Sequence, residues 1–143
     1  MRRPKHPSQD WSDVTEPLEV VGAVIVHNGT VYCTQRGSGP LAGKWEFPGG
    51  KLEAGESPEQ ALVREIEEEL NCQIDVGDRI LTTRHEYNFA TVVLTTYYCT
   101  LRSGRPALSE HQEDAWLSPD ALTSLDWAPA DIPAVHQIQR DHL

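Results

Sequence analysis

The chain has 143 residues, 38% of them hydrophobic and 24% charged, which is the balance of one globular domain large enough to bury an ordinary core. Twelve basic against 22 acidic residues give a formal net charge of −10 at pH 7, which argues against binding to a nucleic acid polymer and against a polybasic membrane anchor. The longest apolar run, residues 20–26, is too short to cross a bilayer, and no apolar stretch follows the basic N-terminal residues as it would in a secretory signal.

The first third of the chain predicts an arm followed by a β-hairpin. Residues 1–17 are polar and contain three prolines, so we expect a loose arm ahead of a single domain over residues 18–143. Asn28-Gly29 is the strongest two-residue signal for a hairpin turn. The strands expected in this part are residues 19–26, 30–35 and 45–47, the last of which follows a glycine-rich loop over 37–44 and ends at Pro48-Gly49-Gly50.

A helix is predicted to follow this part of the chain. Ser57 is a suitable N-cap, Pro58 suits the first helical position, and Gln60 completes a capping box. Asn71 stands where a residue in the left-handed conformation ends a helix. Leu62, Ile66 and Leu70 should form one apolar stripe on this helix, with Val63 in the same arc.

The second half of the chain predicts mainly strands. They are expected over residues 74–76, 80–87, 91–101 and 113–117. A short helix should open at Ser118-Pro119, and a C-terminal helix should occupy residues 133–143. Strands outnumber helices and helices interrupt them, so the fold class is α/β (α+β), with a mixed sheet and helices packed against it.

The three cysteines predict neither a disulfide framework nor a zinc site. Their number is odd and no C-x-x-C spacing occurs. Cys33, Cys72 and Cys99 lie in apolar or strand-like contexts, where each is expected to be a small buried hydrophobic residue. The expected compartment is therefore the reducing cytoplasm.

Three carboxylates share one face of the predicted helix within a turn of each other: Glu65, Glu68 and Glu69. Arg64 lies beside them, and Glu67 points elsewhere. Like charges at this spacing weaken a helix, whereas a divalent cation prefers several oxygen ligands close together. The alternative is an ordinary solvated face. The glycines at 49 and 50 favour the cation, because backbone without side chains can approach a metal or phosphates.

These residues resemble the signature of the Nudix hydrolases. From Gly50, five residues lead to Glu56, and seven more lead to a run whose fixed positions are Arg64, Glu65, Ile66, Glu68 and Glu69. Asn71 stands where the family has glycine. We expect a small cost in stability and no loss of chemistry, because asparagine tolerates the left-handed conformation.

The resemblance implies a Nudix fold, with a mixed β-sheet sandwiched between helices, and hydrolysis of a nucleoside diphosphate linked to another group. It implies that Glu65, Glu68, Glu69 and the carbonyl of Gly49 bind Mg²⁺ or Mn²⁺. Arg64 and Glu56 would hold these glutamates in place, next to Gly50.

Beyond the signature, the chain looks like the MutT and CTP pyrophosphohydrolase branch of the family. Residues 45–51 are similar to the segment before the signature in that branch, and residues 127–133 are similar to its base-recognition segment. Glu110 matches a loop glutamate that can join the metal cluster or deprotonate water. The residues implied to bind substrate are Arg36, Glu46, Phe47, Pro48, Gly49 and Asp131.

Several of these residues have a plainer interpretation. Arg36 fits an exposed strand end, Glu110 a solvated loop acid, Asp131 the N-cap of the last helix and Phe47 the core. His85 and His111 are incidental unless they line the pocket.

Two departures from the guanine-specific members bear on which base is bound. Ala90 stands where those members have arginine, and Asp131 replaces their asparagine. A carboxylate accepts hydrogen bonds from an exocyclic amino group, as on cytosine, and a protonated one can donate to a purine. The expected substrate is therefore CTP, dCTP or a modified cytosine nucleotide, with 8-oxo-dGTP as the alternative.

The expected reaction converts a nucleoside triphosphate and water into a monophosphate and pyrophosphate, with Glu65 or Glu110 as general base. Such an enzyme would serve nucleotide-pool sanitation as a monomer or homodimer. Two alternatives stay open. One is hydrolysis of a nucleoside diphosphate sugar or a dinucleoside polyphosphate, and the other is a catalytically silent domain that senses nucleotides.

Overall fold

The structure, a computed structural model, describes residues 16–108 and 111–141. The arm predicted over residues 1–17 therefore lies almost wholly outside the described residues, and so does Glu110. The seven strands are β1 (Leu18–His27), β2 (Thr30–Arg36), β3 (Trp45–Glu46), β4 (Gly49–Lys51), β5 (Gln73–Glu86), β6 (Thr91–Ser103) and β7 (His111–Leu117). The helices are α1 (Pro58–Leu70) and α2 (Ile132–Asp141), with two short 3-10 helices, η3 (Pro119–Ser124) and η4 (Pro129–Asp131).

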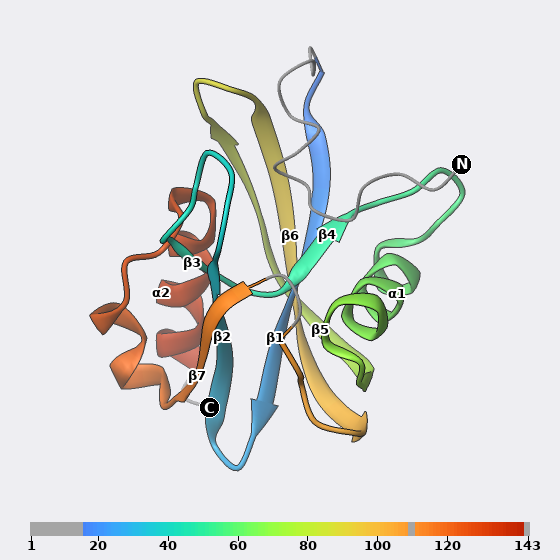
Figure 1. Ribbon diagram of the computed structural model, residues 1–143, viewed down its shortest axis with the longest axis vertical. Helices are drawn as coiled ribbons and strands as arrows, with labels where there is room; N and C mark the ends of the chain where they lie inside the picture. Colours follow the sequence, from blue (N-terminus) through green and yellow to red (C-terminus); the bar gives the residue numbers. More distant parts are fainter. Residues whose placement is uncertain (1–15, 109–110, 142–143) are drawn as a thin grey trace.

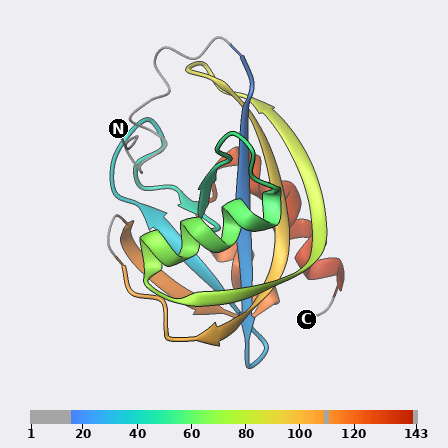
Figure 2. The same ribbon diagram turned by 90° about the vertical axis from the view of Figure 1, so that its right-hand side faces the viewer.

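Strand β1 lies at the centre of the mixed sheet. It pairs in parallel with β6 over residues 18–25 and antiparallel with β4 over residues 20–22. The path of the sheet is β3-β2-β1-β6-β5, with β7 added on β2. Helices α1 and α2 lie on opposite sides of the strands (Figure 1), and α1 runs across them (Figure 2). The predicted fold class, a mixed sheet between helices, is confirmed.

The predicted strands are found within a few residues of their expected ends, with two differences. Residues 49–51 form β4 rather than a turn, because Gly49 has no side chain and can lie directly against β1. A Cβ there would overlap the carbonyl group of Val21 and lie 2.8 Å from its carbon. The two strands expected over 74–76 and 80–87 are one strand, β5, which passes Gly77 and Asp78 through irregular register against β6 instead of breaking.

Helix α1 begins and ends as predicted. The Ser57 hydroxyl accepts a hydrogen bond from the Gln60 backbone N–H (3.1 Å), and the Gln60 side chain accepts one from the Ser57 N–H (2.9 Å). Asn71 has φ 53° and ψ 40°, the left-handed conformation. The predicted stripe of Leu62, Ile66 and Leu70 is buried, whereas Val63, at the edge of the apolar arc, is 40% exposed.

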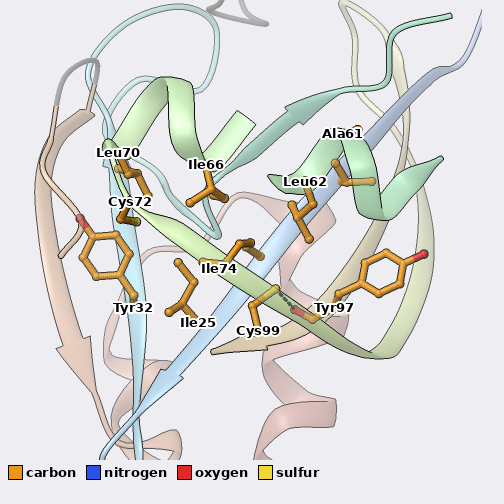
Figure 3. Packing of buried hydrophobic residues seen from close by; sticks show 12 residues of the cluster. Ile25, Tyr32, Ala61, Leu62, Ile66, Leu70, Cys72, Ile74, Tyr97 and Cys99 are labelled. Atoms are coloured by element: carbon orange, nitrogen blue, oxygen red, sulfur yellow. Dashed lines mark hydrogen bonds between the residues drawn. The ribbon is translucent and has the colours of Figure 1, made fainter. Parts of the chain in front are cut away.

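Two apolar clusters hold the helices to the sheet. Leu62, Ile66 and Leu70 of α1 are fully buried in a cluster that includes Ile25 and Ile74 (Figure 3). A second cluster joins α2 and η3 to β1, β2 and Trp127. The three cysteines are free and buried, as predicted. Among the helices of the described segments, none combines the length and apolar character needed to cross a membrane.

Candidate active site

The Arg64 guanidinium ties the loop before α1 to the glutamates of the helix. Its Nε and Nη2 donate to the two carboxylate oxygens of Glu56 at 2.6 and 2.9 Å, and Nη2 also donates to the carbonyl of Lys51 at 3.2 Å. On the helix, Nη1 donates to Glu65 Oε2 at 3.1 Å and to Glu68 Oε1 at 3.4 Å. The hydrogen bond from Arg64 is the largest cause that lowers the pKa of Glu56. The Arg64 guanidinium therefore joins three chain segments: strand β4, the loop before α1 and α1 itself.

Two glutamates of α1, Glu65 and Glu69, are far more buried than residues of a solvated helix face. Glu65 is 6% exposed and Glu69 is 4% exposed. Burial raises the pKa of Glu65, while the Arg64 charge and hydrogen bonds from Arg64 and Glu69 oppose the rise. Glu67 points elsewhere, as expected, and its side chain accepts a hydrogen bond from Gln73 at 3.3 Å. The plainer interpretation of this face as solvated is wrong for Glu65 and Glu69.

The Glu65 carboxylate lies against Gly50 of β4. A Cβ on Gly50 would come within 2.5 and 2.7 Å of the two Glu65 oxygens, so a side chain there would occupy their place. Glu65 Oε1 is buried and finds no hydrogen-bond partner among the described residues. Unpaired buried oxygen and a set of hard carboxylate donors are what a divalent cation requires. These residues therefore fit a divalent cation.

The donors are not gathered into a ready-made cage. In the part of the chain that the structure describes, no three His, Cys, Asp or Glu side chains converge on one point. The Arg64 guanidinium engages both Glu65 and Glu68. An ion at these glutamates would have to share them with Arg64 or displace some of its contacts.

A cleft extends from Gly50 and Glu69 to Asp131. It encloses about 650 Å³ of space, part of it open to solvent. Among its walls are seven of the predicted site residues: Arg36, Glu46, Phe47, Gly49, Gly50, Glu69 and Asp131. Pro48 does not line it; instead its carbonyl accepts a hydrogen bond from the Ala23 N–H at 2.7 Å, which fixes the turn between β3 and β4.

One wall of the cleft is a buried ion-pair network around Glu46. Arg36 is only 3% exposed, so its interpretation as an exposed strand end is wrong. Its Nη1 lies 2.9 Å from Glu46 Oε1, and His111 Nε2 lies 3.1 Å from Glu46 Oε2. Burial raises the pKa of Glu46, but the Arg36 charge and the hydrogen bonds from His111 and Arg36 outweigh it, so the net shift is downward. Glu46 is therefore an ionised carboxylate held between the Arg36 guanidinium and the His111 ring.

Asp131 forms the far end of the cleft. Its Oδ2 accepts a hydrogen bond from the Phe47 backbone N–H at 3.0 Å. Burial first, and then the Glu46 charge, raise the pKa of Asp131 well above its ordinary value. Asp131 immediately precedes helix α2, which begins at Ile132, and the hydrogen bond described for its carboxylate goes to the Phe47 N–H rather than to the helix. Phe47 serves both the core and the cleft, because it packs on Trp127 with ring centroids 4.6 Å apart.

Two polar wall residues, Tyr87 and His111, are not among the predicted site residues. The Tyr87 hydroxyl accepts a hydrogen bond from the Ala130 N–H at 2.9 Å, next to Asp131. His111 lines the cleft, whereas His85 packs on Tyr87 with ring centroids 4.4 Å apart and is not among the wall residues. His111 reaches the site because β7 pairs with β2 and places it opposite Arg36. That pairing joins segments about 75 residues apart and leaves no local signal in the sequence.

Comparisons with known proteins agree with this geometry. The NUDIX domain model matches residues 17–138. The CTP pyrophosphohydrolase of Escherichia coli (strain K12) is 38% identical over 117 residues, which cover 81% of this chain and 87% of that protein. The 8-oxo-dGTP diphosphatase of the same strain is 35% identical over 123 residues, which cover 84% and 94%. The solution structure of the mismatch repair protein MutT from methicillin-resistant Staphylococcus aureus 252 is 49% identical, with a TM-score of 0.73 over 90% of this chain and 99% of that one.

The chain therefore belongs to the Nudix family and is a Nudix hydrolase. Enzymes of this family generally need a divalent metal ion and act on nucleotide substrates.

Proposed function

We propose that this enzyme hydrolyses a cytosine nucleoside triphosphate, CTP, dCTP or a modified form, to the monophosphate and pyrophosphate. The observation that carries the proposal is the cleft itself, which joins Gly50 and Glu69 at one end to Asp131 at the other. Phosphates and base of one nucleotide would thereby meet oxygen ligands and a base-reading carboxyl group within a single space. The E. coli relative named a CTP pyrophosphohydrolase supports this substrate.

The phosphate end would use the glutamates of α1. Glu65, Glu68 and Glu69, with the carbonyl of Gly49, would hold Mg²⁺, or Mn²⁺ in its place. The ion would neutralise charge on the phosphates and make a bound water more acidic. Arg64 and Glu56 would keep the glutamates in position through the contacts described above. The proton of the attacking water would pass to Glu65 or to Glu110, which lies outside the described residues.

The base end would use Asp131 and Phe47, and the sides of the cleft would use Arg36 and Glu46. An ionised Asp131 accepts hydrogen bonds from the amino group of cytosine. The raised pKa of Asp131 also favours a second candidate, 8-oxo-dGTP, because a protonated carboxyl group can donate to the O6 of a purine. The 35% identical 8-oxo-dGTP diphosphatase supports that candidate.

The test is hydrolysis of a nucleotide panel by the purified protein, with and without Mg²⁺, followed by identification of the products. The panel contains CTP, dCTP, 8-oxo-dGTP, a nucleoside diphosphate sugar and a dinucleoside polyphosphate. Monophosphate and pyrophosphate from the first three are expected. Cleavage of the last two alone, or binding without turnover, would refute the proposal.

A matched set of variants tests the metal ligands. Glu68→Gln and Glu69→Gln should each remove most of the turnover and leave the protein folded, because each relieves charge repulsion within α1. Glu67→Gln is the control on the same helix, since Glu67 contacts Gln73 and points away from the cluster. Full activity in either of the first two variants would contradict the assignment.

We also propose that the hydrolase domain spans residues 18–143, that residues 1–17 form an arm, and that the protein acts in the cytoplasm as a monomer or homodimer. The three free, buried cysteines support a reducing compartment. The net charge of −10 supports a free nucleotide as the partner, not a nucleic acid polymer.

A further inference from the structure

His111 has one buried ring nitrogen that nothing in the described structure satisfies. Its side chain is 5% exposed and lines the cleft. The Nε2 atom lies 3.1 Å from Glu46 Oε2, whereas Nδ1 is buried without a hydrogen-bond partner among the described residues. A buried polar atom without a partner is unfavourable, so its presence at a binding cleft calls for an explanation.

The Glu46 contact decides which ring nitrogen carries the hydrogen. Glu46 is held as a carboxylate by Arg36 and can only accept hydrogen bonds. His111 Nε2 must therefore donate to it, and in the neutral tautomer with the hydrogen on Nε2 the Nδ1 atom carries a lone pair. In that form the unsatisfied atom is a hydrogen-bond acceptor that needs an N–H or O–H group.

The chemistry of a nucleotide restricts where that group can come from. The phosphate oxygens of a triphosphate are acceptors near neutral pH, so the donors lie on the sugar hydroxyls and on the amino group of the base. The position of His111 agrees with this, because its partner Glu46 directly precedes Phe47, whose N–H bonds to Asp131 at the base end.

We propose that His111 is a specificity-determining residue, whose Nδ1 accepts a hydrogen bond from the nucleoside part of the substrate, either a sugar hydroxyl or a base amino group. This inference rests on the proposed hydrolysis of nucleoside triphosphates. It assigns to His111 a contact with substrate in addition to its support of Glu46.

Two substitutions of His111 distinguish its contact with the substrate from its support of Glu46. The amide nitrogen of glutamine can reach the position of Nε2, so His111→Gln keeps the bond to Glu46 and loses the acceptor at Nδ1. Asparagine reaches the position of Nδ1, so His111→Asn keeps an acceptor there and loses the bond to Glu46. His136→Gln, at an exposed position of α2, is the control.

The experiment measures kcat/KM of each variant with CTP, 2′-deoxy-CTP, 3′-deoxy-CTP and UTP. His111→Gln should lower kcat/KM for CTP roughly tenfold, the effect of one lost hydrogen bond, and His111→Asn should lower it less. The analogue that lacks the donor group should already have a low kcat/KM with the wild-type enzyme, and His111→Gln should not lower that value further. A deoxy analogue with this behaviour identifies the sugar, and UTP identifies the base.

A binding measurement provides a readout that does not depend on turnover. With ¹⁵N-labelled histidine, adding CTP without metal should shift the Nδ1 resonance of His111 and not that of His136. An equal loss for every substrate, or no loss in His111→Gln with an unmoved Nδ1 resonance, overturns the inference while the proposed function stands. A wild type that hydrolyses no triphosphate overturns the proposed function instead.

Discussion

Replacing Gly50 with alanine should displace the buried Glu65 carboxylate and leave the sheet intact. The added Cβ would lie 2.5 and 2.7 Å from the two Glu65 oxygens, where non-bonded atoms normally keep about 3.5 Å apart. Gly50 is not among the residues with positive φ, so the backbone itself tolerates alanine. The collision is with the end of the Glu65 side chain, which can move. To do so, it must leave the buried position in which Glu65 is only 6% exposed.

The cost follows from overpacking a filled site. Inserting a methyl group into a packed interior costs about 1–3 kcal/mol. For a chain of this length that corresponds to a fall in Tm of roughly 3–12 °C. The effect on catalysis should be larger, because a displacement of about 1 Å at a reacting centre can lower the rate about 100-fold. Gly50→Ala should therefore be a folded but nearly inactive protein.

Thermal unfolding and kcat/KM with CTP, measured on three variants, test this reasoning. Gly22→Ala is the mild control, because its Cβ would lie 3.3 Å from the Thr96 methyl group. Gly49→Ala is the severe control, because its Cβ would overlap the Val21 backbone, which cannot move aside, and it should fail to fold. Wild-type kcat/KM in a folded Gly50→Ala protein would refute a role for the Glu65 position in catalysis.

Three further predictions concern the helix end, the base-reading acid and the arginine. Asn71→Gly should raise the unfolding free energy by about 0.5–1 kcal/mol and leave kinetics unchanged, because asparagine at φ 53° is strained and glycine is not; calorimetry and steady-state assays check this. Asp131 has a raised pKa when folded, so its contribution to stability is present below its ordinary pKa and is lost as the pH rises through the raised value. Urea unfolding from pH 4 to 8 should show the wild type losing stability relative to Asp131→Asn, by up to about 1.4 kcal/mol per pH unit, and parallel curves would contradict it. Arg64→Lys loses the paired bonds to Glu56 and should weaken activation by Mg²⁺ about 10–100-fold in a metal titration; an unchanged titration would show that the glutamates need no such support.

The half of the site that local spacing determines could be predicted from the sequence. Caps at Ser57 and Asn71, and the single helical face of Glu65, Glu68 and Glu69, depend on residues within a few turns of each other. The depth of burial of Glu65 could not be predicted, because it depends on β4, whose Gly50 lies against the Glu65 carboxylate. Nothing in the pattern of residues 49–51 indicates that they form a strand paired with β1.

The other half depends on pairings between distant segments. His111 lies opposite Arg36 through the β2–β7 pairing, and Tyr87 meets Ala130 at the end of β5. A pattern of apolar and polar residues predicts that such strands exist, but it does not predict which strand lies beside which. The continuity of β5 was missed for a similar reason, since pairing with β6 carries it past Gly77.

The two ends of the cleft are encoded in different ways along the chain. The glutamates and Gly50 come from one uninterrupted stretch, residues 49–69, whereas Arg36, Tyr87, His111 and Asp131 come from four separate ones. Under the proposed function, a substitution in one of those four segments would change the wall that faces the nucleoside and leave the glutamates and Gly50 in place. Differences in substrate range between related enzymes should therefore be found mainly at residues outside 49–69.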